Sequence, residues 1–288
     1  MTWTVLAAVL LILPLQAAAP SGPVPTAAAR LAALETRTGG RLGVAVLDTG
    51  SGRRLDHRGK ERFPLCSTFK VLLAGAVLAR VDAGRESLDR RLSYGQADLL
   101  EYAPVTTAHV GQGSLAIADL CAAAVEVSDN TAANLLLQTL GGPGAITIFA
   151  RALGDPVTRL DRTEPTLNTA LPNDPRDTTT PTAMVNTLRA LLLGPVLTPA
   201  SRQRLEGWMA ACTTGQNRIR AGLSTDWVIG DKTGSGELGT VNDVAILRPP
   251  HRAPIFVAVY YTGSTAPMEA RNAVLAEVGR IVAAEFKD

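Results

Sequence analysis

The chain has 288 residues, of which 46% are hydrophobic and 19% are charged. That length allows one large domain or two small ones, and the composition is that of an ordinary globular protein. The net charge is +2, and since no basic run is interleaved with aromatic residues, a nucleic-acid partner is not expected. The three cysteines and three histidines are scattered without metal-ligand spacing, so we predict no metal site and no cofactor.

The first 19 residues have the pattern of a secretory signal peptide. An apolar core over residues 5–15 is too short to span a bilayer, and Ala17-Ala18-Ala19 offers small residues for cleavage before Pro20. The alternative is a buried N-terminal helix, because the segment before the core lacks Lys and Arg. We expect a mature protein that is periplasmic or secreted, monomeric and without a membrane-spanning segment.

The mature chain has β-rich runs near both ends and helical patterns between them. A capping residue followed by proline marks the start of a helix, and glycine marks its end. Runs of β-branched residues bounded by Gly and Pro mark the strands. In chain order, we predict a helix over 27–37, strands over 42–48 and 53–57, helices over 67–81, 115–125, 129–140 and 143–154, helices that begin at Thr180-Pro181 and Thr198-Pro199, strands over 227–232, 240–247 and 255–261, and a final helix over 267–286.

Two strands at the start and three at the end most simply join in one antiparallel five-stranded sheet flanked by helices. The helical middle is then an insertion. We therefore predict a discontinuous α/β lobe, residues 20–65 and 211–288, and an all-α lobe, residues 66–210. Residues 155–179 carry turn formers and little periodicity, and so long a loop inside a compact domain is usually functional.

Four short motifs supply the groups that acyl transfer through a serine requires. They are Ser67-Thr68-Phe69-Lys70, Ser128-Asp129-Asn130, Glu164-Pro165-Thr166-Leu167-Asn168 and Lys232-Thr233-Gly234. Ser67 opens a predicted helix with Lys70 one turn on, which puts a hydroxyl beside an amine on one helix face. Alone, each motif could be a helix cap, a solvated loop carboxylate or the end of a strand. All four in this order and spacing exceed coincidence.

With these motifs, and with Tyr102 in Glu101-Tyr102-Ala103-Pro104-Val105, the chain resembles the class A serine β-lactamases over nearly its whole mature length. The resemblance implies a sheet lobe made from both ends of the chain, an all-helical lobe, and a site between them. It also implies a small-molecule β-lactam substrate and hydrolysis through a serine acyl-enzyme, which confers antibiotic resistance.

By the same resemblance, Ser67 attacks the lactam carbonyl, and the N–H groups of Ser67 and Ser235 form the oxyanion hole. Glu164 and Asn168 position the water that hydrolyses the ester. Either Lys70 or Glu164 takes the first proton, and the sequence leaves both open. A Glu-Pro bond is a candidate for a cis peptide, which would turn the carboxylate inward.

The resemblance also assigns the leaving group and the substrate contacts. Ser128 would relay a proton to the leaving nitrogen, and Lys232 would keep its surroundings positive. The residues that would bind the substrate are Tyr102, Asn130, Arg218, Thr233, Gly234 and Ser235.

Two further matches concern arginines. Some family members hold the substrate carboxylate from the position of Arg218 and others from the position of Val241, so here Arg218 is expected to serve; the alternative is an ordinary surface residue. Arg162 and Asp177 match the ion pair that closes the catalytic loop in the family.

The cysteines depart from the family pattern. The position of Cys121 is often disulfide-linked in the family, but the partner position here is Ala74. We therefore expect Cys66, Cys121 and Cys212 to be free thiols, with Cys66 packing beside the nucleophile rather than reacting.

Two other functions remain open at this stage. A penicillin-binding peptidase acting on cell-wall D-Ala-D-Ala shares the serine and both lysines but lacks the Glu164 and Asn168 water site. A non-hydrolysing β-lactam binder would form a stable covalent adduct and never turn over.

Overall fold

The structure is a computed structural model that describes Met1 and residues 25–287. The predicted signal peptide beyond Met1, and its cleavage site, lie outside the described residues. No helix in the described part of the chain is both long and apolar enough to cross a membrane.

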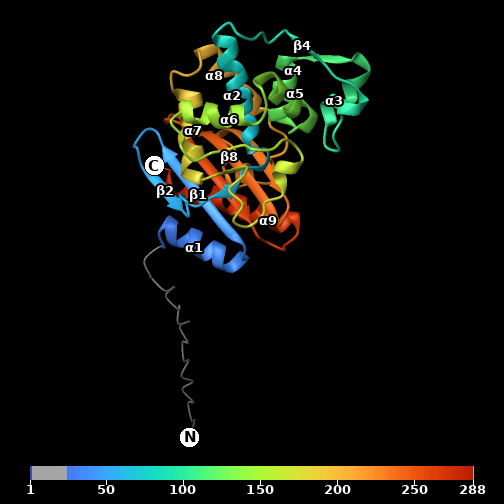
Figure 1. The fold of residues 1–288 in the computed structure, drawn as a ribbon. Coiled ribbons are helices and arrows are strands. Elements are labelled where there is room, and N and C mark those ends of the chain that lie inside the picture. The colour runs from blue at the N-terminus through green and yellow to red at the C-terminus, as the bar shows by residue number, and fades with distance from the viewer. Residues whose placement is uncertain (2–24, 288) are drawn as a thin grey trace.

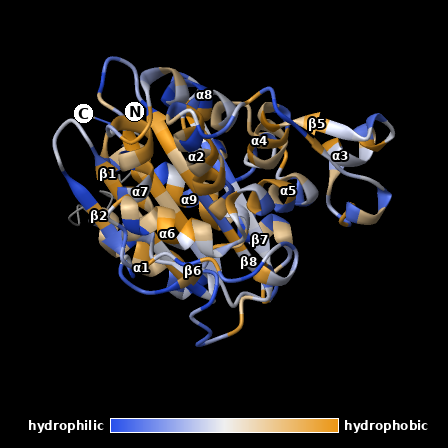
Figure 2. Cartoon of the chain, turned by 45° about the horizontal axis from the view of Figure 1, so that its top comes forward, coloured by the Kyte–Doolittle hydropathy of each residue, from blue (hydrophilic) through white to orange (hydrophobic). Residues whose placement is uncertain are grey.

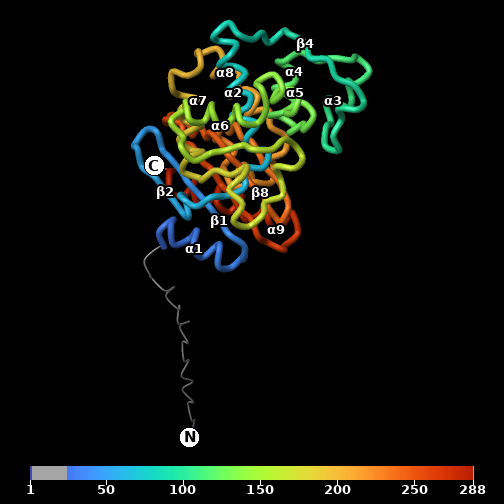
Figure 3. Tube along the Cα trace, viewed as in Figure 1, coloured from blue at the N-terminus to red at the C-terminus, as the bar shows by residue number. Residues whose placement is uncertain are grey.

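One antiparallel sheet of five strands joins the two ends of the chain, as predicted (Figure 1). Its order is β2-β1-β9-β8-β7, so the last strand in the chain lies in the middle of the sheet. The tube in Figure 3 shows blue N-terminal strands beside orange C-terminal ones. The strands are β1 (Arg41–Asp48), β2 (Arg54–His57), β7 (Val228–Gly236), β8 (Thr240–Arg248) and β9 (Ile255–Thr262).

Helices cover both faces of this sheet. Alternate residues of each strand point to opposite sides, and apolar residues on each side pack against helices. Val44 and Val46 belong to the hydrophobic cluster with α1 (Ala27–Thr38) and α9 (Met268–Glu285). Ala45 and Leu47 belong to the cluster on the other side, where α7 (Pro181–Leu193) and α8 (Pro199–Ala210) pack. Both faces of the sheet are therefore buried.

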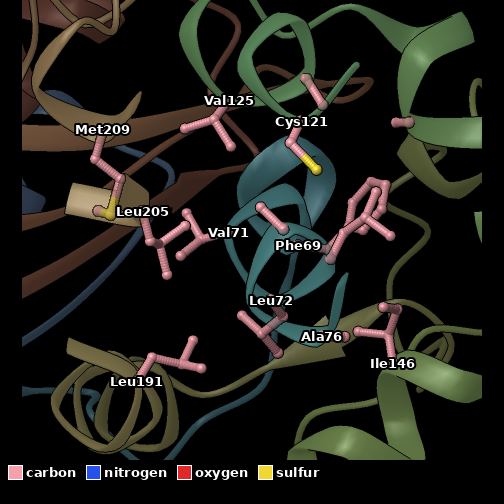
Figure 4. Close-up of a cluster of buried hydrophobic side chains, with 14 of the residues drawn as sticks. Phe69, Val71, Leu72, Ala76, Cys121, Val125, Ile146, Leu191, Leu205 and Met209 are labelled. Carbon is pink, nitrogen blue, oxygen red and sulfur yellow. The ribbon is translucent and has the colours of Figure 1, made fainter. Parts of the chain in front are cut away.

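The helical middle is organised around α2 (Phe69–Asp82), which is buried along its first ten residues. A helix that is apolar all round must be enclosed by other elements. Figure 4 shows Phe69, Val71, Leu72 and Ala76 of α2 facing side chains of the surrounding helices. These helices are α4 (Ile117–Glu126), α5 (Asn130–Leu140) and α6 (Gly144–Ala152), with α7 and α8 on the sheet side.

The cluster around α2 continues without a break into Val244, Ile246 and Phe256 of the sheet. The hydrophobic core thus spans both predicted lobes, and their division at residues 65/66 and 210/211 stays a prediction. A small extension made of α3 (Pro104–His109), β4 (Arg91–Ser93) and β5 (Ser114–Ala116) projects from the rest of the molecule (Figure 2).

Several predicted boundaries were wrong. The helix expected over 67–81 begins as a 3₁₀ turn, Cys66–Thr68, and becomes α-helical only at Phe69. Leu115 lies in β5 rather than in a helix, and α4 begins at Ile117. The short elements α3, β3 (Phe63–Pro64), β4, β5 and β6 (Thr178–Thr179) were not predicted, because two to six residues are too few to show a hydrophobic period.

The three cysteines are free and buried, as expected. Burial raises the pKa of all three thiols, which keeps them protonated and unreactive at neutral pH. We predict that a thiol-specific reagent labels three cysteines in the denatured protein and none in the native protein within minutes. Fewer than three labelled thiols in the denatured protein would contradict the structure.

Candidate active site

The predicted nucleophile lies where the 3₁₀ turn enters α2. Ser67 is nearly buried, and its Oγ donates a hydrogen bond of 2.9 Å to Oε1 of Glu164. Cys66, just before it, has a φ of 43°, in the left-handed region that residues other than glycine seldom adopt. Such backbone geometry is typical of functional sites, where surrounding contacts hold it in place.

Lys70 lies one turn further along the chain and is completely buried. Its Nζ is 3.0 Å from Glu164 Oε1 and donates to the Ser128 carbonyl (2.8 Å), to Ser128 Oγ (3.3 Å) and to Asn130 Oδ1 (2.6 Å). Burial lowers the pKa of the Lys70 ammonium, and the neighbouring Glu164 carboxylate opposes that shift. The first and second motifs therefore meet at one buried amine.

Glu164 is fixed in the loop by a residue that the sequence analysis missed. The side chain of Asn134 in α5 accepts from the Glu164 N–H (3.0 Å) and donates to the Glu164 carbonyl (2.9 Å). Asn134 lies four residues after Asn130, on the same helix face, and that spacing could have revealed it. Asn168 Nδ2 donates to Glu164 Oε2 at 2.6 Å, and the Glu164–Pro165 bond is cis. Both carboxylate oxygens are therefore engaged.

The predicted ion pair at the base of this loop is present. Arg162 Nε lies 2.5 Å from Asp177 Oδ2, and Asp177 Oδ1 accepts from the backbone N–H groups of Asp161 and Arg162. The Asp177 side chain is buried. Removing the Arg162 side chain would leave the buried Asp177 carboxylate without its ion-pair partner, so the loop should stay closed only while both residues are present.

Ser128 lies between the two motif lysines. Its Oγ is 3.3 Å from Lys70 Nζ and 3.0 Å from Lys232 Nζ, and its φ is 63°. Lys232 is completely buried and also donates to the Thr233 carbonyl. Burial, reinforced by the nearby Lys70, lowers the pKa of Lys232 to about 7.

The sequence suggested that the fourth motif, Lys232-Thr233-Gly234, ends its strand, but the strand continues beyond it. β7 continues through Ser235 to Gly236 and pairs with β8 along its whole length, so Lys232, Thr233 and Gly234 are inside a regular ladder. The strand runs further because each of these residues has a backbone partner in β8. Its side chains consequently alternate between the two faces of the sheet at fixed positions.

Arg218 is buried behind this strand, so the surface alternative is wrong. Its Nη1 donates to the carbonyls of Gly234 (2.7 Å) and Asn242 (2.6 Å), its Nη2 donates to Ser235 Oγ (2.7 Å), and its Nε donates to Asn272 Oδ1 (3.1 Å). These four bonds fix the guanidinium beside Gly234 and Ser235 of β7.

Most of the predicted site residues line a cleft of about 330 Å³. Lys70, Glu164 and Lys232 are buried beside it rather than lining it. Thr214 was not predicted; its Oγ1 is 2.5 Å from Thr233 Oγ1. In the described residues, no group of three or more His, Cys, Asp or Glu side chains could hold a metal ion. The cleft is lined by Ser67, Tyr102, Ser128, Asn130, Asn168, Thr214, Arg218, Thr233, Gly234 and Ser235.

The site has one hydroxyl hydrogen-bonded to a buried carboxylate, with two buried amines beside it. This arrangement of groups is typical of a serine hydrolase. Comparison with known proteins is consistent with that class. A family model described as the beta-lactamase enzyme family matches residues 26–286.

The chain is 50% identical over 253 residues to beta-lactamase CTX-M-8 of Citrobacter amalonaticus, covering 88% of this chain and 87% of that one. It is 51% identical to beta-lactamase AST-1 of Nocardia asteroides, covering 88% and 81%. The solved structure of the class A beta-lactamase of the last common ancestor of Gram-negative bacteria matches with a TM-score of 0.89 at 64% identity, covering 90% and 99%. The chain belongs to the β-lactamase enzyme family, in class A.

Proposed function

We propose that this β-lactamase opens the lactam ring of its substrates by acyl transfer to Ser67 and then releases the acyl group to water. The observation that carries the proposal is the convergence on one carboxylate: Ser67 Oγ and Lys70 Nζ both meet Glu164 Oε1, and Asn168 Nδ2 meets Oε2. The hydrogen bond from Ser67 favours Glu164 as the group that takes the first proton.

Hydrolysis of the acyl-enzyme would use the other oxygen of the same carboxylate, Glu164 Oε2. Asn168 Oδ1 is buried without a hydrogen-bond partner, and such an atom invites a bound water. A water there would donate to Asn168 and to Glu164, and its oxygen would attack the Ser67 ester. Glu164 would take a proton from the water and pass it to Ser67 Oγ as the C–O ester bond breaks, which restores the hydroxyl and releases the ring-opened acid.

The remaining residues would orient the substrate. The N–H groups of Ser67 and Ser235 would stabilise the oxyanion. Ser128, between the two lysines, would pass its proton to the leaving nitrogen and recover one from Lys70. Lys70 would in turn take the first proton from Glu164, which leaves Glu164 ionised for the second half of the reaction. Asn130, whose Oδ1 accepts from Lys70, would donate through Nδ2 to the substrate's side-chain amide.

The substrate carboxylate would meet the positive end of the cleft. Lys232 and Arg218 supply charge, and the hydroxyls of Thr233 and Ser235 supply donors. Gly234 lets the substrate approach the β7 backbone, and the half-exposed Tyr102 would wall the entrance. We further propose a monomer that acts on small β-lactams after export to the periplasm or medium.

Mass spectrometry after rapid quenching tests the proposal. With a penicillin, the native enzyme is expected to show a short-lived adduct of the substrate's full mass on the peptide that contains Ser67, followed by complete conversion to the ring-opened acid. Ser67→Ala should show neither adduct nor turnover. A native enzyme that stays acylated after the substrate is gone would favour a penicillin-binding peptidase or an inert binder.

A further inference from the structure

A short strand at the base of the catalytic loop touches both sides of the reaction centre. In β6, Thr178–Thr179 pairs with the segment Phe63–Pro64 that leads to the nucleophile. On its other side, Arg159 N donates to the Thr178 carbonyl at 3.0 Å. Leu65 N donates to the Asp177 carbonyl at 2.8 Å. β6 therefore lies between the entry to the loop and the entry to the nucleophile turn.

This arrangement makes β6 a common support for the nucleophile and the base. Ser67 follows Leu65 by two residues, and Glu164 follows Arg159 by five. The hydrogen bond of 2.9 Å between Ser67 Oγ and Glu164 Oε1 consequently depends on where β6 lies. The rate of a reaction falls steeply when the reacting groups are displaced by about an ångström.

A buried carboxylate at the start of this loop holds β6 in place. Asp155 Oδ1 accepts from the N–H groups of Val157 (2.7 Å) and Thr158 (2.9 Å), and its Oδ2 accepts from the hydroxyls of Thr158 (2.5 Å) and Thr187 (3.0 Å). Thr158 Oγ1 is in turn 2.6 Å from Thr179 Oγ1. The side chains form one chain of contacts from α7 to β6.

The cluster is buried, and its carboxylate and hydroxyl oxygens are hydrogen-bonded. Asp155 and its three threonine neighbours are all at least 95% buried. The nearby guanidinium of Arg151 binds the carbonyls of Asp155 and Thr158 rather than the carboxylate. Burying a carboxylate is costly unless donors satisfy it, and here hydroxyl and N–H groups do so. The aspartate thereby fixes Thr158 and Thr179 in one arrangement.

We propose that Asp155 is a positioning residue for ester hydrolysis. Through Thr158 and Thr179 it fixes β6, and the position of β6 sets the distance between Ser67 and Glu164. The inference rests on the proposed role of Glu164 in deacylation. It is distinct from the Arg162–Asp177 pair, which closes the loop from within. Deacylation is affected more than acylation, because Ser67 is also anchored by α2, whereas Glu164 is held by the loop and by Asn134.

The test measures acylation and deacylation separately in Asp155→Ala and Asp155→Asn by rapid quench and mass spectrometry. Asp155→Ala is expected to deacylate about 10- to 100-fold more slowly and to accumulate acyl-enzyme, with kcat and KM falling together. Asp155→Asn should recover most of the rate, since its Oδ1 still accepts both N–H groups and its Nδ2 can donate to the threonine hydroxyls.

Asp48→Ala provides the matched control. Asp48 is also buried and accepts from an N–H (Gly50) and a hydroxyl (Ser51), with an additional ion pair to Arg252, but it lies in the β1–β2 hairpin away from the cleft. It should lose thermal stability without accumulating acyl-enzyme. If Asp155→Ala does not fold, Thr158→Val removes only the hydroxyl contacts, and it should slow deacylation in the same direction.

Two results would overturn the inference: native deacylation rates in folded Asp155→Ala or Thr158→Val, or equal accumulation of acyl-enzyme in Asp48→Ala. Glu164→Gln separates this inference from the proposed function. If Glu164→Gln accumulates acyl-enzyme and folded Asp155→Ala does not, only the role of Asp155 fails. If Glu164→Gln turns over normally, the proposed mechanism fails as well.

Discussion

Replacing Glu164 with Gln is expected to trap this enzyme at the acyl stage, with deacylation slowed by about 10²- to 10⁴-fold. The amide keeps the shape of the side chain, and the two Asn134 contacts are to the Glu164 backbone, so the loop should stay in place. What is lost is the basic oxygen that receives a proton from water. The adduct should be visible by mass spectrometry for minutes after mixing with a penicillin.

The same variant also tests which group takes the first proton. If Glu164 accepts it from Ser67, acylation should slow as well, whereas a Lys70-driven acylation would keep its rate. Glu61→Gln is a suitable control, because Glu61 is an exposed acid bound to Arg41 and Arg58 and does not line the substrate cleft. Rapid turnover by Glu164→Gln without an adduct would exclude the carboxylate as the hydrolytic base.

The second large effect concerns pH. Lys232 has a pKa of about 7, because burial removes the hydration of its ammonium and Lys70 lies close by. Below pH 7 the group is charged and attracts the substrate carboxylate; above it the charge is lost. We therefore expect kcat/KM to fall on the alkaline side with an apparent pKa near 7, by about 100-fold at pH 9.

Bound substrate should shift the alkaline fall to higher pH. A carboxylate beside the ammonium favours its charged form, so the alkaline fall in kcat should lie at higher pH than the fall in kcat/KM. Lys232→Arg is the decisive variant, because arginine keeps its charge throughout this range. Its profile should lose the alkaline fall, even if its maximum is lower. An unchanged profile in Lys232→Arg would assign the titration to another group, such as Lys70.

The sheet could be predicted because its strands carry a local signal. β1 and β9 are rich in apolar and β-branched residues, β8 is a similar run interrupted by Asn242 and Asp243, and all three are bounded by Gly and Pro. The structure gives their ranges within a residue of the prediction. β3 and β6 carry no such signal, because two residues show no period. Their pairing depends on tertiary contact between segments more than a hundred residues apart.

The candidate site divides in the same way. Ser67, Ser128 and Lys232 stand in short motifs whose residue types already suggest proton transfer. Asp155 is a single polar residue, and nothing local distinguishes a buried Asp from an exposed one. Asn134 has only one local signal, its spacing of four residues from Asn130. Their importance follows from partners brought to them by the fold, which is why the motif analysis passed over both.

The position of β9 determines when this protein can fold as it is made. Its strand of residues 255–262 separates β1 from β8, although β1 is synthesised more than two hundred residues earlier. A growing chain therefore holds an N-terminal hairpin that lacks its principal neighbour until synthesis is nearly complete. Such a chain can complete its sheet only when nearly all of its residues have been made.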